Sequence, residues 1–309
     1  MSTATDLAIL ELPFKAPFDW PRILRFFAGR ATPGVEAVED GAYRRVIDWA
    51  GDSGTLTVRP HPRKRCIVAS IEGPAGRHAE ALAAPIARMF DLHVDPKAIA
   101  AHFAADPWLA PLIDAAPGLR VPGAWSAFEL VVRAIVGQQV SVKAATTIIG
   151  RLVQRAGQRI EDHPHERTAW RFPTPAALAA ADMAQIGMPG KRVAALQGMA
   201  AAVASGAVPL DSHAAADTVD TDALRAALLA LPGIGPWTVE YVAMRAWRDA
   251  DAWPAWDLVL MQSIAARDPT LLRPTQQRSR TDAWRPWRAY AAMHLWNEVA
   301  DRAGTARGG

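Results

Sequence analysis

Residues 231–241 read LPGIGPWTVEY, in which a Pro/Gly-rich turn leads directly into a segment with the pattern of a helix. Another helical pattern precedes the turn, so the sequence predicts a helix-hairpin-helix over approximately residues 222–247. Gly233 and Gly235 carry no Cβ that would hold a backbone amide away from an anion. We expect the amides of Gly233, Ile234 and Gly235 to face a phosphate at the positive end of the second helix. An ordinary helix–helix turn is the alternative.

The composition of the whole 309-residue chain limits which classes of protein it can belong to. Its length suits two or three subdomains, and half of its residues are hydrophobic without any run long enough to span a bilayer. The opening residues lack a basic region before an apolar stretch, so the sequence predicts a soluble intracellular protein. A lone cysteine, Cys66, excludes an intramolecular disulfide, a cysteine-based zinc site and a four-cysteine iron–sulfur cluster. The net charge of +3 permits a phosphate-rich partner and an arginine-solubilised surface equally.

The hydrophobic pattern divides the chain into two parts. Residues 1–95 contain four strand-like segments broken by turns, together with two helical segments, and predict an α+β domain. Residues 96–309 are dominated by alanine-rich helical segments. Trp125, Phe128 and Val132 recur there at helical spacing, as on a helix with one buried face. We therefore expect an all-α second part.

Six segments resemble, in the same order, the AlkA type of bacterial 3-methyladenine DNA glycosylase II within the helix-hairpin-helix DNA glycosylase superfamily: PFDWPRIL, GLRVPGAWSAFELVVRAIVGQQVSV, FPTPAALAAAD, IGMPGKR, LPGIGPWTVEYVAMRAW and WRPWRAYAAMHLW. They are spread over most of the chain. The resemblance implies an N-terminal antiparallel-sheet domain followed by a helical core of two subdomains with a cleft between them. It also implies a DNA glycosylase that releases alkylated purines such as 3-methyladenine and 7-methylguanine from duplex DNA and so initiates base-excision repair.

Asp257, in WPAWDLVL, matches the aspartate that follows the hairpin in this superfamily. Breaking a base–sugar bond builds positive charge on the deoxyribose, which a nearby carboxylate stabilises. A helix N-terminus favours the ionised carboxylate, burial beside Trp253 and Trp256 opposes it, and we expect ionisation to prevail. A plain helix N-cap is the alternative role. Asp249 and Asp251 lie in a polar loop and are expected to be solvated.

Trp237 occupies the hairpin exit, where superfamily members that also cut the strand present a lysine. The resemblance therefore implies hydrolysis alone, without a Schiff base. It also assigns Trp237, Tyr241 and Trp296 to the base pocket, and Tyr241 shares a helical face with Trp237. Core packing is the alternative for any tryptophan. We expect His294 to be structural, and three further tryptophans to belong to the core: Trp247, Trp284 and Trp287.

Other DNA contacts follow from the resemblance. The resemblance implies that a residue of the GQxVSV turn fills the gap left by an extruded base. Gln139 stands at that position, where the family pattern implied by the resemblance has leucine. Gln138 and Gln139 are otherwise ordinary turn residues. Lys191 and Arg192 follow the turn GMPGKR at a helix start, where phosphate contact and simple exposure are equally consistent with the sequence.

The resemblance implies no required cofactor. Family members can hold a monovalent cation on hairpin carbonyls, which would here be those of Leu229, Leu231 and Ile234. The expected partner is double-stranded DNA with damaged bases. We expect the protein to be a monomer without membrane contact. We expect it to act in a bacterial-type cytoplasm, associated with the nucleoid. Two alternatives remain open: a glycosylase of the same fold for oxidised or deaminated bases, and a DNA-binding protein that has lost excision.

Overall fold

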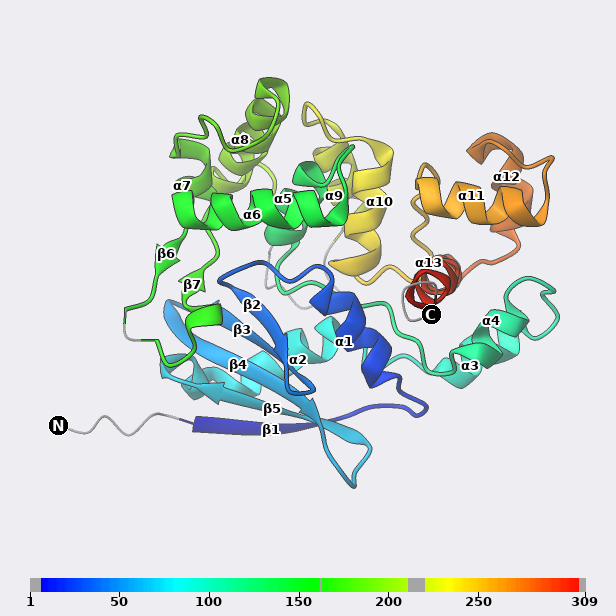
Figure 1. The fold of residues 1–309 in the computed structure, drawn as a ribbon, viewed down its shortest axis with the longest axis horizontal. Coiled ribbons are helices and arrows are strands. Elements are labelled where there is room, and N and C mark those ends of the chain that lie inside the picture. Colours follow the sequence, from blue (N-terminus) through cyan, green and yellow to red (C-terminus); the bar gives the residue numbers. More distant parts are fainter. Residues whose placement is uncertain (1–6, 162, 211–219, 306–309) are drawn as a thin grey trace.

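The computed structural model describes residues 7–161, 163–210 and 220–305 (Figure 1). Its N-terminal part is a five-stranded antiparallel sheet in the order β1-β5-β4-β3-β2. Alternating burial along β1 and β5 matches a sheet with one face against a core. The predicted antiparallel-sheet domain is confirmed. Its strands are β1 (Leu7–Pro13), β2 (Glu36–Glu39), β3 (Ala42–Trp49), β4 (Asp52–Pro60) and β5 (Cys66–Glu72).

Two helices and a short 3₁₀ segment complete this domain. Helix α1 (Trp20–Ala28) begins where the Asp19 side chain accepts a hydrogen bond from the amide of Arg22, and Pro21 suits its first turn. Helix α2 (Ala79–Met89) follows η1 (Pro74–His78). The buried members of the domain's core run from Trp20 to Leu92. The domain boundary at residue 95 stays a prediction.

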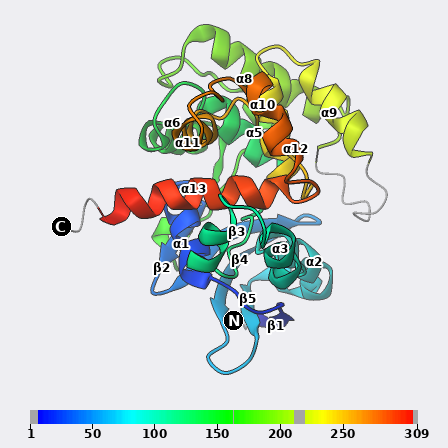
Figure 2. The same cartoon turned by 90° about the vertical axis from the view of Figure 1, so that its right-hand side faces the viewer.

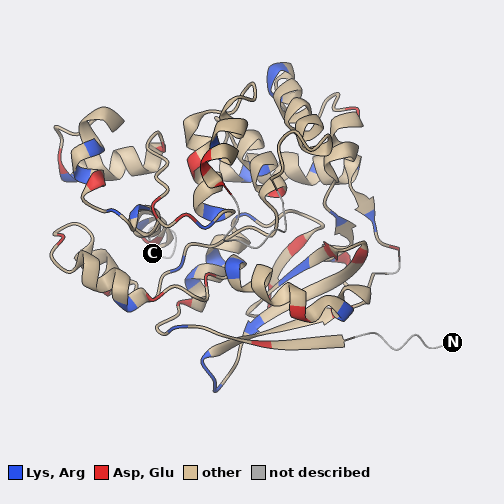
Figure 3. Ribbon diagram, turned by 180° about the vertical axis from the view of Figure 1, so that it is seen from behind, with Lys and Arg blue, Asp and Glu red and all other residues tan. Residues whose placement is uncertain are grey.

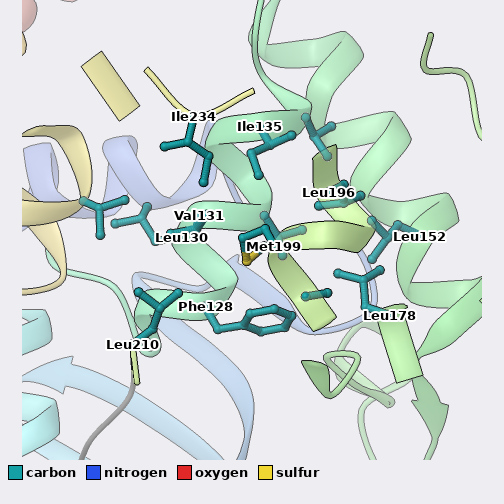
Figure 4. Close-up of a cluster of buried hydrophobic side chains, with 14 of the residues drawn as sticks. Phe128, Leu130, Val131, Ile135, Leu152, Leu178, Leu196, Met199, Leu210 and Ile234 are labelled. Carbon is teal, nitrogen blue, oxygen red and sulfur yellow. The ribbon is translucent and has the colours of Figure 1, made fainter. Parts of the chain in front are cut away.

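The second part of the chain is helical, as predicted, and forms two hydrophobic clusters. Side chains of α5, α6, α8 and α10 form one cluster, which Figure 4 shows around Phe128 and Met199. The other cluster joins α3, α4, α11 and α13. The bounds are α3 (Pro96–Phe103), α4 (Ala110–Ala115), α5 (Ala127–Val136), α6 (Val142–Ala156), α7 (Pro175–Ala180), α8 (Gly190–Ala204), α9 (Thr221–Leu229), α10 (Pro236–Arg245), α11 (Leu258–Arg267), α12 (Pro274–Asp282) and α13 (Arg288–Thr305).

Helix α13 occupies a central place between the parts. In Figure 2 it crosses the molecule with the sheet domain on one side and the α5–α10 helices on the other. A small ribbon of β6 (Gln158–Arg159) and β7 (Trp170–Arg171), with η2 (Glu166–Thr168) before β7, connects α6 to the sheet domain. The amide of Trp170 donates to the carbonyl of Gly34 at 2.9 Å. The sequence showed no sign of this ribbon because two-residue strands are too short to show alternation.

A buried ion-pair network fastens the sheet domain to α5. The guanidinium of Arg45 on β3 donates to Glu129 on α5 at 2.8 Å, and Arg133 on α5 donates to Glu36 on β2 at 2.8 Å. Burial tends to raise the pKa of Glu36, but the charges of Arg133 and Arg45 outweigh it and lower that pKa to about 2. Burial raises the pKa of Glu129. Each buried charge thus depends on a partner from the other part of the chain.

Replacing Arg45 by Met is expected to lower the unfolding free energy by about 3–5 kcal/mol, because it leaves Glu129 buried beside no cation from the sheet. Urea unfolding followed by circular dichroism measures the loss. Arg63→Met, at an exposed position, is the matched control and should change the unfolding free energy by less than about 0.5 kcal/mol. Equal stability of the two variants would contradict the role of this network.

Candidate DNA-repair active site

The predicted helix-hairpin-helix is confirmed as α9, a tight turn and α10. Gly233 has a φ of +81°, and a Cβ there would lie 2.7 Å from the Cβ of Ala195 on α8. Gly235 is the N-cap of α10 with an ordinary φ of −107°, and a Cβ there would meet nothing within 4 Å. The fold itself therefore requires glycine at 233, whereas Gly235 leaves open space in front of a helix N-terminus.

The three hairpin amides are not equivalent. The amide of Ile234 donates to the carbonyl of Leu231 at 3.2 Å, and the Ile234 side chain lies in the cluster that also contains Ile135 (Figure 4). Within the described part of the chain, the amide of Gly235 makes no backbone hydrogen bond. A ligand in front of α10 would therefore meet the amide of Gly235 and the first-turn amides of the helix.

The hairpin carbonyls suit a monovalent cation by their chemistry. Leu229 is the last residue of α9, where a carbonyl has no later helical partner and the helix dipole favours a cation. The carbonyl of Leu231 accepts one hydrogen bond, from Ile234, and keeps a lone pair. The candidate ligands of the cation are neutral carbonyl oxygens, which suit a monovalent ion. Among the described residues there is no group of three or more His, Cys, Asp or Glu side chains that could hold a metal ion.

The carboxylate of Asp257 accepts hydrogen bonds from three separate helices. Its Oδ2 accepts from the indole Nε1 of Trp237 at 3.0 Å, and its Oδ1 accepts from the indole Nε1 of Trp296 at 2.9 Å. Oδ1 also accepts from the amide of Leu260 at 3.1 Å, so Asp257 is the N-cap of α11. All three groups are donors only, which suits a carboxylate, an acceptor only. The N-cap role is therefore real, but it accounts for one of the three bonds.

The three predicted pocket residues meet around this carboxylate. The rings of Trp237 and Tyr241 are stacked with centroids 5.0 Å apart, and Tyr241 meets Trp296 edge to face at 6.3 Å. Tyr241 packs against the first helical cluster and Trp296 against the second, so the group lies where the two clusters adjoin. Trp284 is fully buried, and Trp247 and Trp287 pack against the clusters.

The expectation that Asp249 and Asp251 are solvated is wrong. Asp249 forms an ion pair with Arg225, and Asp251 accepts from Arg288 at 2.8 Å. The loop that carries them folds back against α9 and α13, so long arginine side chains reach both carboxylates. Both carboxylates are therefore engaged in ion pairs within the fold.

The GQxVSV turn lies against the hairpin. The side-chain amide of Gln138 donates to the carbonyl of Gly233 at 3.0 Å. Gln139 is exposed and has a φ of +59°, an uncommon conformation for a residue with a side chain. The first turn of α8 contains Arg192 and the exposed Lys191. It lies one turn before Ala195, the α8 residue closest to Gly233. The turn and the start of α8 thus flank the hairpin.

Two residues near these aromatic rings were not predicted from the sequence. Arg245, at the end of α10, is 4% exposed and donates to the hydroxyl of Tyr241 at 2.6 Å. Its guanidinium lies 4.7 Å from the ring centroid of Phe26 on α1. The spacing of four residues between Tyr241 and Arg245 was a visible signal. Nothing in the sequence indicated that Phe26 of the N-terminal domain would lie beside them.

Two family models match the chain. One, described as the AlkA N-terminal domain, matches residues 9–126, and the other, described as HhH-GPD superfamily base excision DNA repair protein, matches residues 132–289. The chain belongs to this base-excision DNA repair superfamily. The resemblance inferred from the six segments is confirmed.

Individual relatives agree with this membership. The chain is 34% identical over 288 residues to DNA-3-methyladenine glycosylase 2 of Escherichia coli, covering 92% of this chain and 95% of that protein. It is 38% identical over 294 residues to a probable bifunctional transcriptional activator/DNA repair enzyme AlkA of Mycobacterium tuberculosis. That match covers 94% of this chain but 57% of the relative, so the chain spans little more than half of that protein's length.

Solved structures share the fold. A 3-methyladenine DNA-glycosylase from Archaeoglobus fulgidus superposes with a TM-score of 0.77 at 20% identity, covering 95% of this chain and 98% of that one. A structure of MBOgg1 with a low-affinity DNA ligand gives a TM-score of 0.74 at 18% identity, covering 97% of this chain and 100% of that one.

In the described residues no helix has the length and apolar character needed to cross a membrane.

His294 on α13 is expected to make stability depend on pH. It is 4% exposed, and burial lowers its pKa from 6.5 to about 4. Between these values the unfolded chain binds a proton that the folded protein does not, so stability is full above pH 6.5 and falls as the pH drops toward 4. The loss from this group is about 3 kcal/mol, measured by urea unfolding across that pH range.

His294→Leu should remove this share of the pH dependence, because leucine cannot take up a proton. The control, His93→Leu, changes an exposed histidine and should leave the slope of the wild-type protein intact. The assignment fails if both variants retain the wild-type slope.

Proposed function

We propose that this protein is a monofunctional DNA glycosylase, a hydrolase that cleaves the N-glycosidic bond of alkylated purines in duplex DNA. The observation that carries the proposal is the Asp257 carboxylate, held by the indoles of Trp237 and Trp296 beside the hairpin. Superfamily membership and the E. coli relative named DNA-3-methyladenine glycosylase 2 support it. The substrate is DNA with 3-methyladenine or 7-methylguanine, and the product is an abasic site that starts base-excision repair.

The proposed reaction uses the carboxylate as a fixed charge. The damaged nucleotide is extruded, and its base enters beside Trp237, Tyr241 and Trp296. The glycosidic electron pair leaves with the base, and positive charge builds on C1′ of the sugar. Asp257 stabilises that charge through the free lone pair of its Oδ2, water adds to C1′, and a proton is released.

DNA binding is assigned to the turns around this site. The amides of the hairpin at Gly233 and Gly235 face the phosphate backbone, and Ile234 anchors that turn in the core. Lys191 and Arg192 contribute phosphate contacts, and Gln139 enters the gap left by the extruded base. Figure 3 shows Lys and Arg interspersed with Asp and Glu over both parts of the chain. We assign phosphate binding to helix ends as well as to cationic side chains.

We further propose that the protein is a monomer and that it acts in a bacterial-type cytoplasm at the nucleoid. Its proposed substrate is DNA, and its E. coli relative is bacterial. No cofactor takes part in the chemistry. A monovalent cation on the carbonyls of Leu229, Leu231 and Ile234 would offset phosphate charge when bound.

Asp257→Asn should lower the single-turnover rate of base release from methylated DNA by at least about 10²-fold, because the fixed negative charge is lost. DNA affinity should be unchanged or higher, since a negative charge near the backbone is removed. Released base is measured by chromatography and affinity by fluorescence anisotropy. Asp114→Asn, at an exposed position, is the control. Near-normal excision by Asp257→Asn would refute this mechanism. DNA binding without any release by the wild-type protein would favour the non-catalytic alternative.

Trp237 at the hairpin exit predicts the absence of strand cleavage. Borohydride should trap no covalent protein–DNA adduct during excision, and breaks should appear only after alkali or an added lyase. Gel electrophoresis of labelled duplex shows both results. A trapped adduct would assign chemistry to an amine, and its loss in Lys191→Ala would identify that amine.

Stacking on aromatic rings predicts a preference for cationic bases. A methyl group on purine N3 or N7 makes the base positive, which strengthens its attraction to an indole by roughly 0.5 to 2 kcal/mol. We expect excision of 3-methyladenine and 7-methylguanine, with slower excision of neutral hypoxanthine. Trp296→Ala should slow excision of the cationic bases more than that of hypoxanthine.

Trp296→Phe is the matched control for the ring, because both variants lose the hydrogen bond to Asp257. The difference between them therefore reports the aromatic face alone. Equal losses for cationic and neutral bases would show that the ring contributes shape only. Strict preference for one neutral lesion would favour a glycosylase for oxidised or deaminated bases.

A further inference from the structure

The hydrogen bond between Arg245 and Tyr241 has a fixed direction. A guanidinium has donors only, so Arg245 Nη1 donates and the Tyr241 oxygen accepts, at 2.6 Å. The proton of the Tyr241 hydroxyl is therefore not used in this bond. Among the residues that the structure describes, no acceptor for that proton is recorded. The hydroxyl keeps one donor, on a ring that is stacked on Trp237 and meets Trp296.

The guanidinium that fixes this direction is itself held on all three nitrogens. Its Nε donates to the carbonyl of Pro122 at 2.8 Å and its Nη2 to the carbonyl of Gly123 at 3.1 Å. The amide of Gly123 in turn donates to the carbonyl of Met89 on α2 at 2.8 Å, and a Cβ on Gly123 would lie 2.8 Å from the Met89 Cα. The orientation of Arg245 is thus set by the join between the two parts of the chain.

Charge around the phenol acts in the same sense. Burial tends to raise the pKa of Tyr241, but the charges of Arg245, Arg30 and Arg133 outweigh it and leave that pKa below its usual value of 10. Burial lowers the pKa of Arg245 to about 10, so its guanidinium stays charged at neutral pH. The hydroxyl of Tyr241 is therefore a stronger donor than an ordinary phenol.

We propose that Tyr241 donates a hydrogen bond from its hydroxyl to an acceptor atom on the edge of the extruded purine, and that Arg245 is the positioning residue that reserves the hydroxyl for this task. The inference rests on the proposed function and deepens it. It adds a polar reader to a pocket in which the sequence indicated only aromatic faces. Acceptor atoms at purine nitrogens and carbonyl oxygens are the chemistry that the hydroxyl recognises.

The bond matters most for neutral bases. A neutral purine that leaves with the glycosidic electron pair carries developing negative charge, so a donor to its acceptor atom becomes stronger in the transition state. A cationic 7-methylguanine leaves as a neutral base, and the same donor gains less. Arg245 thus helps the slower substrates and, through its positive charge, disfavours the cationic ones.

The test compares excision of hypoxanthine and 7-methylguanine by Tyr241→Phe, which removes the hydroxyl and keeps the ring. The ratio of the hypoxanthine rate to the 7-methylguanine rate should fall roughly 10- to 100-fold, with the loss in the single-turnover rate rather than in KM. Tyr290→Phe is the matched control. It removes the buried hydroxyl of Tyr290 on α13, which donates to Asp91, and should keep the wild-type ratio. An unchanged ratio in Tyr241→Phe would overturn the inference.

The role of Arg245 has its own spectroscopic readout, because the chain has only three tyrosines. The pKa values of Tyr43 and Tyr290 are raised well above 10, by burial and by the charges of Glu36 and Asp91 respectively. In an alkaline titration followed by tyrosinate absorbance, a first phase of one tyrosine should therefore appear below pH 10 and vanish in Tyr241→Phe.

Arg245→Met should move this first phase to higher pH, because burial then acts without the opposing charge, and should lower the same rate ratio. Arg245→Lys keeps a cation and should retain part of both effects. A first phase that stays at the same pH in folded Arg245→Met would overturn the positioning role. If Arg245→Met does not fold, the excision ratio of Tyr241→Phe decides the inference. Failure of the wild-type protein to release any base would instead refute the proposed function.

Discussion

The Asp257 carboxylate is the acceptor on which the arrangement of the site depends. Its donors come from α10, α11 and α13, so one side chain connects the hairpin, the helix it caps and the helix that crosses the molecule. Any shift of these helices relative to one another would break a charge-assisted hydrogen bond. The same bonds hold the indoles of Trp237 and Trp296 on either side of the carboxylate. The hydrogen bonds that position the carboxylate therefore also position the two indoles.

The N-terminal domain contributes to this site although no residue of its sheet lies in it. Arg45 and Glu36 of the sheet form buried ion pairs with α5, and a buried charge tolerates little displacement from its partner. The segment before α5 is then close-packed against α2 at Gly123 and presents carbonyls to Arg245. Arg245 donates to the hydroxyl of Tyr241, so the position of the N-terminal domain affects where that hydroxyl lies. Contacts of the sheet domain thus extend to the side chain of Tyr241.

The two glycines of the hairpin differ in what the fold requires of them. Gly233 is needed because of its positive φ and its contact with α8, and Ile234 secures the turn in the core. These requirements are internal to the protein and would exist without DNA. Gly235 has no such internal requirement, and its empty space lies in front of the positive end of α10. No contact within the described residues requires glycine at that position.

The sequence by itself indicated the candidate residues and most of the elements, because their signals are local, but it did not indicate the short strand β2. The Pro/Gly turn before Trp237, the helical spacing of α5 and the alternation of the strands all depend on neighbours a few residues away. The order of the six segments was sufficient for the family, and it singled out Asp257 as the candidate carboxylate. It was not sufficient for the ion pairs of Asp249 and Asp251, the β6–β7 ribbon or the place of Phe26.

Only the tertiary structure decided which donors reach Asp257 and how Tyr241 is used. Trp296 is 39 residues from Asp257, and Arg245 is 122 residues from the carbonyl of Gly123. A backbone carbonyl has no sequence signature, and a tryptophan in a core has the same pattern as a tryptophan that donates to a carboxylate. Packing distinguishes them, because it brings together groups whose separation along the chain carries no information about their distance in space.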